Sequence, residues 1–371
     1  MQHPSPAPLP EGIHARFAAN VNGLTMHYLE AGRAESGQAA RPCLLLLHGF
    51  PELAYSWRKI MLPLVAAGFH VIAPAQHGYR ATQTQPVSYD DDIAPYRMLN
   101  LVQDALTLLT RLNIERVHAV IGHDYGSPVA GWCALTRPDV FQRVVLMSAP
   151  FTGAPANLEG TRQLMAALAQ LPQAREHYQA YYGTREANAD MLQAPQGLHA
   201  FLRAYYHMKS ADWPHNQPEP LGTATPQALA RLPTYYVMHK GMGMAATVAP
   251  HAPSAQTIAA CHWLPDAELA TYTLSFERTG FQGGLQWYRC GLDDTNAQAL
   301  MPYAGKTLDV PACFIAGARD WGIYQSPGAF EKMQRQTCTA LRQVSLIPQA
   351  GHWVQQEQPD AVIASLLRFL A

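Results

Sequence analysis

Residues 117–126 read VHAVIGHDYG, an apolar run that ends in an aspartate flanked by glycines. The run Val117–Ile121 predicts a buried strand, and a helical pattern begins at Pro128. A sharp turn between a strand and a helix presents its middle side chain, and glycines on either side allow such a crowded turn. The stretch therefore predicts a nucleophile elbow with Asp124 at its tip.

Other apolar runs of strand length lie on both sides of this elbow. They are Leu24–Leu29, Cys43–Leu47, His70–Ala73, Val144–Met147, Ala312–Ala316 and Gln343–Ile347. Apolar residues recur at helical spacing over residues 98–109 and 361–369, between and after these runs. Alternating strands and helices predict an α/β fold with a doubly wound, mostly parallel sheet.

The alternation stops near Pro150 and resumes near Asp309. Between them, helical patterns occur near residues 164–171 and 198–205, whereas the many prolines of 209–262 predict long loops. We expect three parts: core residues 1–151 with a loose start at 1–12, a helical cap over 152–305, and core residues 306–371. Ligands of open α/β sheets bind beyond the carboxyl ends of the strands, so a cap inserted there would cover the site.

Composition excludes several classes of partner. The formal net charge is −1 and no basic run occurs, which argues against nucleic acid. Neither a His-Glu-x-x-His nor a Cys-x-x-Cys pattern occurs, so we expect no metal and no other cofactor. The apolar runs are too short to span a membrane, and no signal peptide is visible. Six scattered cysteines favour free thiols in the cytoplasm, and the sequence leaves a homodimer open.

An aspartate at the elbow sets the chemistry. A carboxylate is ionised at neutral pH, needs no base to attack, and suits displacement at an sp³ carbon, which yields an alkyl ester. Hydrolysis of that ester requires a base, normally a histidine held by a second carboxylate. Asp320 and His352 each follow a predicted strand, in the order nucleophile, acid, histidine. We therefore expect a catalytic triad of Asp124, Asp320 and His352.

The segment HGFPE at residues 48–52 directly follows the predicted strand Cys43–Leu47. A turn there can aim the backbone N–H of Phe50 into the site. Together with the backbone N–H of Tyr125, it would form an oxyanion hole for the ester hydrolysis step.

Taken together, these residues resemble the epoxide hydrolases of the α/β-hydrolase fold over nearly all of residues 20–371. The most specific segment is FERTGFQGGLQWYR at 276–289, which resembles the cap motif that carries a ring-opening tyrosine. The resemblance implies that role for Tyr288 and, in HYQAYY at 177–182, for Tyr178, with Tyr181 as an alternative. It also implies a small-molecule epoxide as substrate and a vicinal diol as product. A neutral phenol can protonate the departing alkoxide, because its pKa lies near 10.

Two segments depart from the family pattern. The stretch AQHGYR at 75–80 lacks the usual Asp, Arg and second Gly, so the neighbouring pocket is expected to differ. Residues 221–263 of the cap match no interpretable pattern.

Three other functions remain as alternatives: dehalogenase, serine esterase and non-catalytic ligand binding. Haloalkane and haloacid dehalogenases share the fold and the aspartate nucleophile. Haloalkane dehalogenases typically have Trp after the nucleophile, where this chain has Tyr125, and fluoroacetate dehalogenases have arginines where this chain has Ser127–Gly131. A serine esterase would require Ser at position 124. A non-catalytic ligand-binding protein would not need all three triad residues.

Overall fold

The computed structural model of the chain describes residues 5–35, 37–79, 82, 85–155 and 158–371. Its main sheet has eight strands in the order β1-β2-β4-β3-β5-β6-β9-β10. Their bounds are β1 His14–Val21, β2 Leu24–Ala31, β3 Cys43–Leu47, β4 His70–Pro74, β5 Ala119–His123, β6 Val144–Met147, β9 Ala312–Gly317 and β10 Leu341–Ile347. Strand β2 is antiparallel to β1 and β4, and the other pairs are parallel. The predicted α/β fold with a mostly parallel sheet is confirmed.

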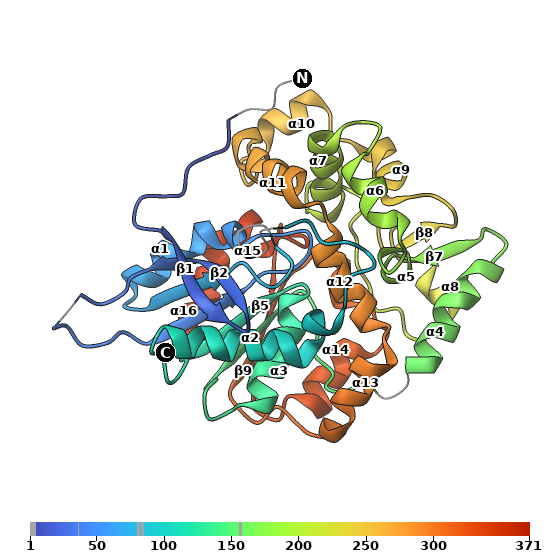
Figure 1. Cartoon of the computed structure of the whole chain (residues 1–371). Helices are drawn as coiled ribbons and strands as arrows, with labels where there is room; N and C mark the ends of the chain where they lie inside the picture. Colours follow the sequence, from blue (N-terminus) through green and yellow to red (C-terminus); the bar gives the residue numbers. More distant parts are fainter. Residues whose placement is uncertain (1–4, 36, 80–81, 83–84, 156–157) are drawn as a thin grey trace.

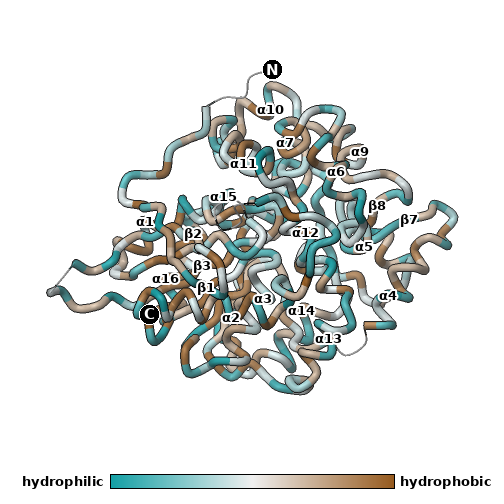
Figure 2. The backbone as a smooth tube through the Cα atoms, viewed as in Figure 1, coloured by the Kyte–Doolittle hydropathy of each residue, from teal (hydrophilic) through white to brown (hydrophobic). Residues whose placement is uncertain are grey.

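Two apolar layers cover the two faces of this sheet. Leu44 and Leu46 pack with helices α1 (Arg58–Ala66) and α16 (Pro359–Leu370), whereas Leu45 and Leu47 face the layer that holds α2 (Met98–Arg111) and α3 (Gly126–Thr136). Successive side chains of a strand point to opposite faces, so a strand covered on both faces must be apolar throughout. This explains the unbroken apolar runs of the sequence (Figure 2).

In the sequence, the insertion, residues 152–305, falls between β6 and β9, and in space its helices α5, α6 and α9 lie to one side of the main sheet (Figure 1). Its helices are α4 Leu158–Ala167, α5 Tyr178–Tyr182, α6 Glu186–Leu192, α7 Leu198–Lys209, α8 Pro226–Leu229, α9 Met244–Val248, α10 Ala255–Ala260, α11 Asp266–Thr279, α12 Gln282–Gly291 and α13 Asp294–Leu300. Two short strands, β7 Arg175–His177 and β8 Val237–His239, pair with each other and not with the main sheet. The expectation of long loops over 209–262 was correct for residues 210–225, which form no helix or strand, and wrong for the rest, where α8, β8, α9 and α10 form.

The remaining helices are short. After β9 come α14 Ala329–Lys332 and α15 Val354–Glu357. Single turns occur at η1 Ala54–Trp57, η2 Ala94–Tyr96, η3 Leu168–Gln170, η4 Ala249–His251, η5 Met301–Tyr303, η6 Trp321–Ile323 and η7 Met333–Thr337. No helix formed by the described residues combines the length and the apolar character that crossing a bilayer requires.

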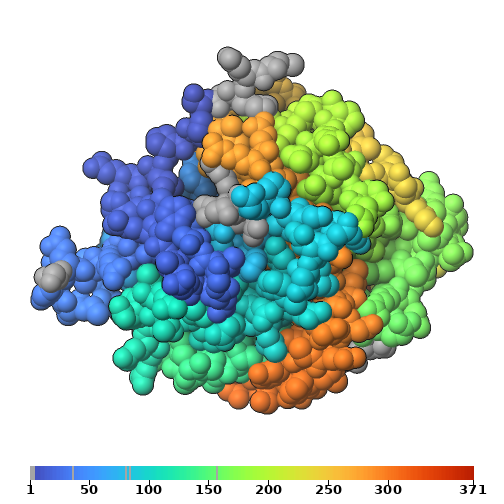
Figure 3. All heavy atoms as spheres, in the orientation of Figure 1, coloured from blue at the N-terminus to red at the C-terminus, as the bar shows by residue number. Residues whose placement is uncertain are grey.

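The core segment 85–97 forms hydrogen bonds with the insertion. It crosses the front of the molecule in cyan, against the green and orange atoms of the insertion (Figure 3). The carbonyl of Tyr89 accepts a hydrogen bond from Arg289 at 2.5 Å, and that of Ser88 accepts one from Gln286 at 3.0 Å. The second half of helix α12 is therefore bonded to the core.

The N-terminal segment, expected to be loose over residues 1–12, forms no helix or strand over residues 5–12. It makes one backbone contact with the insertion, from the N–H of Ala7 to the carbonyl of Ala267 in α11 at 2.9 Å. Residues 1–4 lie outside the described residues. Strand β1 was not predicted, because it is an edge strand in which only Ala18 and Val21 are buried.

Candidate active site

The elbow has the strained geometry that its sequence predicted. Asp124 follows β5 with φ at +52°, in the left-handed region that non-glycine residues seldom adopt. A Cβ on Gly122 would lie 1.9 Å from the carbonyl oxygen of Gly126, and a Cβ on Gly126 would lie 2.1 Å from that of Leu47. Only glycine fits at either position, and the resulting turn directs the Asp124 carboxylate away from the sheet.

The three predicted triad residues lie together at the carboxyl ends of β5, β9 and β10. Nε2 of His352 lies 3.1 Å from Oδ2 of Asp124. Nδ1 of the same ring lies 3.1 and 3.2 Å from the two carboxylate oxygens of Asp320. Asp320 also accepts a hydrogen bond from the N–H of Gly322 at 2.7 Å, which fixes its carboxylate at the start of η6. All three side chains are buried.

Both carboxyl groups are held in their ionised forms. Burial alone would raise the pKa of Asp124, but hydrogen bonding to His352 and the nearby positive charges outweigh it and lower that pKa below its ordinary value. Burial also opposes ionisation of Asp320, and the attraction to His352 again outweighs it, so its pKa is lowered. Asp124 therefore stays a carboxylate at neutral pH, the form that a nucleophile requires.

One of the two N–H groups of the expected oxyanion hole already contacts Asp124. The N–H of Phe50 donates to Oδ1 of Asp124 at 2.9 Å. The N–H of Tyr125, at the start of α3, donates to no acceptor within the described part of the chain. A helix N-terminus carries unsatisfied N–H groups that favour negative charge. Because Phe50 donates to Oδ1, Oδ2 beside His352 is the carboxylate oxygen that has no backbone N–H partner among the described residues.

The two tyrosines predicted in the insertion are both buried, and both lie within the electrostatic influence of the Asp124 carboxylate. The ring centroids of Tyr178 and Tyr288 lie 5.8 Å apart, and Tyr288 also packs edge-on against Phe50 and Tyr125. Burial, reinforced by the charge of Asp124, raises the pKa of both phenols well above 10. The hydroxyl of Tyr178 donates to Gln325 at 2.9 Å, whereas that of Tyr288 has no hydrogen-bond partner among the described residues.

The alternative tyrosine points elsewhere. The hydroxyl of Tyr181 donates to Oδ2 of Asp190 at 2.5 Å, inside the insertion. Its raised pKa comes from burial and from Asp190, and Asp124 is not among the causes. Of the two candidates in this helix, the geometry favours Tyr178.

Two facing glycines bring α12 close to the core. A Cβ on Gly283 would lie 2.0 Å from the carbonyl oxygen of Gly78, and a Cβ on Gly78 would lie 2.6 Å from that of Gly283. The backbone of α12 therefore rests directly on the loop after β4. The hydroxyl of Tyr125 donates to the carbonyl of Trp287 at 2.8 Å, which fixes the turn before Tyr288. Although residues 75–80 depart from the family pattern, they keep Gly78, the glycine that this contact needs. Arg80 lies outside the described residues.

Sequence reasoning missed a buried pair behind the triad. Nδ1 of His123 lies 2.5 Å from Oε2 of Glu52, and Nε2 of His123 lies 2.7 Å from the carbonyl of His352. Burial would lower the pKa of His123, but Glu52 outweighs it and raises that pKa. Glu52 was visible in HGFPE, yet no spacing rule connects it with a histidine 71 residues later.

Lys209 was also missed. This lysine ends α7 and is buried, with its ammonium 5.0 to 5.4 Å from the ring centroids of Tyr205, Tyr236 and Trp353. Such cation–π contacts partly replace lost hydration. Its charge contributes to the lowered pKa of Asp124. Position 209 lies on the same helical face as Leu202 and Tyr205, a signal that sequence reasoning did not use because lysines are seldom buried.

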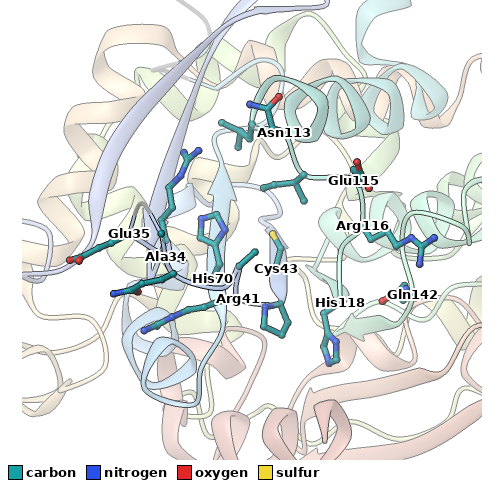
Figure 4. Close-up of a pocket in the computed structure, with 17 residues that line it drawn as sticks. Ala34, Glu35, Arg41, Cys43, His70, Asn113, Glu115, Arg116, His118 and Gln142 are labelled. Carbon is teal, nitrogen blue, oxygen red and sulfur yellow. The ribbon is translucent and has the colours of Figure 1, made fainter.

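A large surface cavity is unrelated to this chemistry. It measures about 820 Å³ and is lined by Arg41, Cys43, His70 and Arg116 among others (Figure 4). Cys43 and His70 begin β3 and β4, so this cavity lies at the amino ends of the strands, opposite the triad. Within the described residues, no group of three or more His, Cys, Asp or Glu side chains could hold a metal ion.

Comparison with known proteins agrees with this geometry. The sequence model described as the alpha/beta hydrolase fold matches residues 42–359, so the chain is an α/β hydrolase. Epoxide hydrolase A of Mycobacterium tuberculosis is 31% identical over 97% of this chain and 98% of its own length.

Two solved structures extend this comparison. An epoxide hydrolase from an endophytic Streptomyces has a TM-score of 0.77 and 29% identity, covering 97% of this chain and 96% of its own. Epoxide hydrolase A from Mycobacterium thermoresistibile has a TM-score of 0.75 and 33% identity, and the match covers 96% of this chain and 98% of its own. The chain belongs to the epoxide hydrolases of the α/β hydrolase fold, and it is an enzyme that hydrolyses an ether bond.

Proposed function

We propose that Asp124 opens the epoxide by attacking a ring carbon through Oδ2, while Oδ1 stays on the N–H of Phe50. The observation that carries this proposal is the contact of Asp124 with both Phe50 and His352. The carbon–oxygen bond of the ring breaks as the ester bond forms. The released electron pair stays on the epoxide oxygen as an alkoxide, which must gain a proton.

Tyr288 and Tyr178 are the proposed proton donors. Because burial and Asp124 raise their pKa values, both phenols are neutral at physiological pH and carry the proton that the alkoxide needs. Tyr288 has its hydroxyl free for the substrate, and Tyr178 would exchange Gln325 for it. One positioned donor contributes roughly 10²- to 10⁴-fold to such a step.

The second half-reaction is assigned to His352. Nε2 of its ring takes a proton from water, and the hydroxide attacks the carbonyl carbon of the Asp124 ester. Asp320 holds Nδ1–H and stabilises the imidazolium that forms. The N–H groups of Phe50 and Tyr125 would stabilise the oxyanion of the tetrahedral intermediate. Collapse of that intermediate breaks the ester C–O bond, and the departing diol oxygen takes the proton held by the His352 imidazolium. The carboxylic acid left at Asp124 then loses its proton, which returns through solvent to the tyrosinate formed in the first step.

A variant that lacks the base tests this assignment. His352→Gln mixed with styrene oxide should gain the mass of one substrate per chain, and peptide mapping should place it on Asp124. Wild-type protein should not retain the adduct, because His352 clears the ester. Absence of any adduct in His352→Gln, with Asp124→Asn as the matched blank, would contradict the covalent mechanism.

We further propose that residues 152–305 act as the cap of a cytoplasmic enzyme whose partner is a small-molecule epoxide. The reducing location is supported by the cysteines, since all six are free thiols and five are buried. The cap role is supported by Tyr178 and Tyr288, which both come from this segment.

A further inference from the structure

One carboxylate binds both sides of the loop that carries His352. Glu357 ends α15, five residues after the histidine. Its Oε2 accepts the N–H of Gly351 at 2.9 Å, and its Oε1 accepts the N–H of Trp353 at 2.9 Å. The same Oε2 also accepts the N–H of Ala211 at 2.8 Å. Ala211 belongs to the insertion, so this single side chain joins the insertion to the histidine loop.

The histidine itself completes the contact. The N–H of His352 donates to the carbonyl of Lys209 at 2.8 Å, so three successive N–H groups of this loop are all bonded. A Cβ on Gly351 would lie 2.5 Å from the carbonyl carbon of Ser210 and 2.6 Å from the nitrogen of Ala211. The two backbones therefore touch, and only a glycine at 351 lets Glu357 reach across them.

Side chains add to the same contact. Nε1 of Trp353 donates to the carbonyl of Tyr206 at 2.9 Å, and the two rings lie 4.4 Å apart. The end of α7 therefore also contacts Trp353, the residue that follows the histidine. The orientation of His352 relative to Asp124 depends on where the insertion sits.

We propose that Glu357 is a positioning residue that fixes the His352 loop to the insertion and thereby controls the hydrolysis of the ester without affecting its formation. This rests on the roles proposed for Asp124 and His352. Ester formation uses Asp124 and the two tyrosines, none of which bonds to Glu357. Hydrolysis needs Nε2 of His352 aligned on a water, and a misplacement of about 1 Å can cost on the order of 10²-fold.

Burial raises the pKa of Glu357 to about 8, and the three backbone N–H donors oppose that rise because they stabilise the carboxylate form. Three N–H donors converge on two oxygens, and a carboxylate accepts bonds on both. A glutamine has one acceptor oxygen, and its NH₂ group would face an N–H donor. Glu357→Gln therefore keeps the size of the side chain but turns at least one bond into a donor–donor contact, which moves the loop.

The test separates the two half-reactions in the full-length enzyme. Stopped-flow tryptophan fluorescence and rapid-quench mass spectrometry with styrene oxide would give the rates of ester formation and decay. In Glu357→Gln we expect ester decay to slow roughly 10- to 100-fold, ester formation to change less than about threefold, and the Asp124 ester to accumulate.

Asp293→Asn is the matched control. Asp293 pairs with Arg97 at 2.9 Å and so also joins the insertion to the core, but it bonds to no described residue of the histidine loop. Loosening the insertion there should leave the ratio of the two rates unchanged. If Glu357→Gln does not fold, Glu357→Asp, which keeps the charge but is one methylene shorter, is measured in its place and should show the same split.

Three outcomes would overturn the inference. Equal slowing of both steps would make Glu357 an ordinary structural residue, and unchanged decay would mean that the loop needs no support. If no ester forms in His352→Gln either, the proposed function fails first and this inference fails with it. The ester signal of His352→Gln therefore tells the two failures apart.

Discussion

Nε2 of His352 lies 3.1 Å from Oδ2 of Asp124, so the proposed base and the proposed nucleophile are in contact before any substrate enters. Once Oδ2 forms an ester bond it carries no negative charge, so the contact between a carboxylate and Nε2 is lost. Nε2 then faces the ester with Nδ1 still held by Asp320, and a water can take the vacated place. The resting contact therefore keeps the base aligned for the step in which it is needed.

Asp320→Asn should impair the second step alone. The asparagine cannot hold the ring in the required tautomer or stabilise the imidazolium, so ester decay should fall roughly 10²- to 10⁴-fold. Ester formation should keep its wild-type rate, because it needs no base. Single-turnover kinetics with quench and mass spectrometry would measure both rates. Normal decay in this variant would remove Asp320 from the triad.

Tyr288→Phe and Tyr178→Phe should slow ester formation. Each removes one donor to the ring oxygen, and we expect losses of roughly 10- to 1000-fold in the first step. Tyr181→Phe is the matched control, because its hydroxyl bonds to Asp190 and should leave that step unchanged. The burst-phase rate of ester formation would be measured in all three variants. A large loss in Tyr181→Phe alone would reverse the assignment of the second tyrosine.

Gly283→Ala should displace the cap helix. Its Cβ would lie 2.0 Å from the carbonyl oxygen of Gly78, so α12 must move off the core and carry Tyr288 with it. We expect a lower melting temperature and a loss of ester formation of roughly 10-fold or more. Gly291→Ala, in the same helix with nothing within 4 Å of the added Cβ, should be neutral or slightly stabilising. Equal behaviour of the two variants would show that the glycine contact is unimportant.

The sequence predicted those parts of the fold that depend on local pattern. Strands such as β3 and β6 are buried on both faces, so their apolar runs identified them to the residue. Strand β1 has only two buried positions and carried no such pattern. The elements between Pro226 and Ala260 are only three to six residues long, too short for a helical or strand period to be seen.

The same distinction holds for the site. Asp124, Asp320 and His352 each follow a strand, so the order of elements placed them at one edge of the sheet. Contacts between segments that are far apart in the sequence produce no pattern in the sequence. Glu357 meets Ala211 across 146 residues, and Lys209 lies beside the triad only because α7 folds back over it. Pairings of this kind require the tertiary structure.

The Glu52–His123 pair predicts a specific dependence of stability on pH. Burial raises the pKa of Glu52, but His123 outweighs it and the net pKa is lowered, so its contribution is present above the unfolded value of 4.5 and is lost as the pH falls through the folded value. The pKa of His123 is raised, so its contribution is present below 6.5 and is lost as the pH rises through its folded value.

The pair should therefore stabilise most between about pH 4.5 and 6.5. The difference in unfolding free energy between wild type and Glu52→Gln should peak there, at on the order of 3 kcal/mol for a broken buried pair. Urea unfolding at several pH values would measure it. A difference that stays constant from pH 3 to pH 9 would show that the two groups do not titrate as an ion pair.

Heavy-oxygen water gives the most direct test of how the ring is opened. If Asp124 attacks carbon, the oxygen that enters the first diol comes from Asp124 itself, and water replaces it only when the ester is hydrolysed at its carbonyl carbon. One turnover of unlabelled wild-type protein in ¹⁸O water should therefore label Asp124 and leave the first diol unlabelled. Mass spectrometry of the diol and of the Asp124 peptide would read both positions. Direct attack of water on the epoxide, with Asp124 as general base, predicts the reverse pattern, because the water oxygen would enter the diol and the carboxylate would form no bond. Glu357→Gln sharpens the comparison: its slower ester decay should delay the label in Asp124 without changing where the label goes.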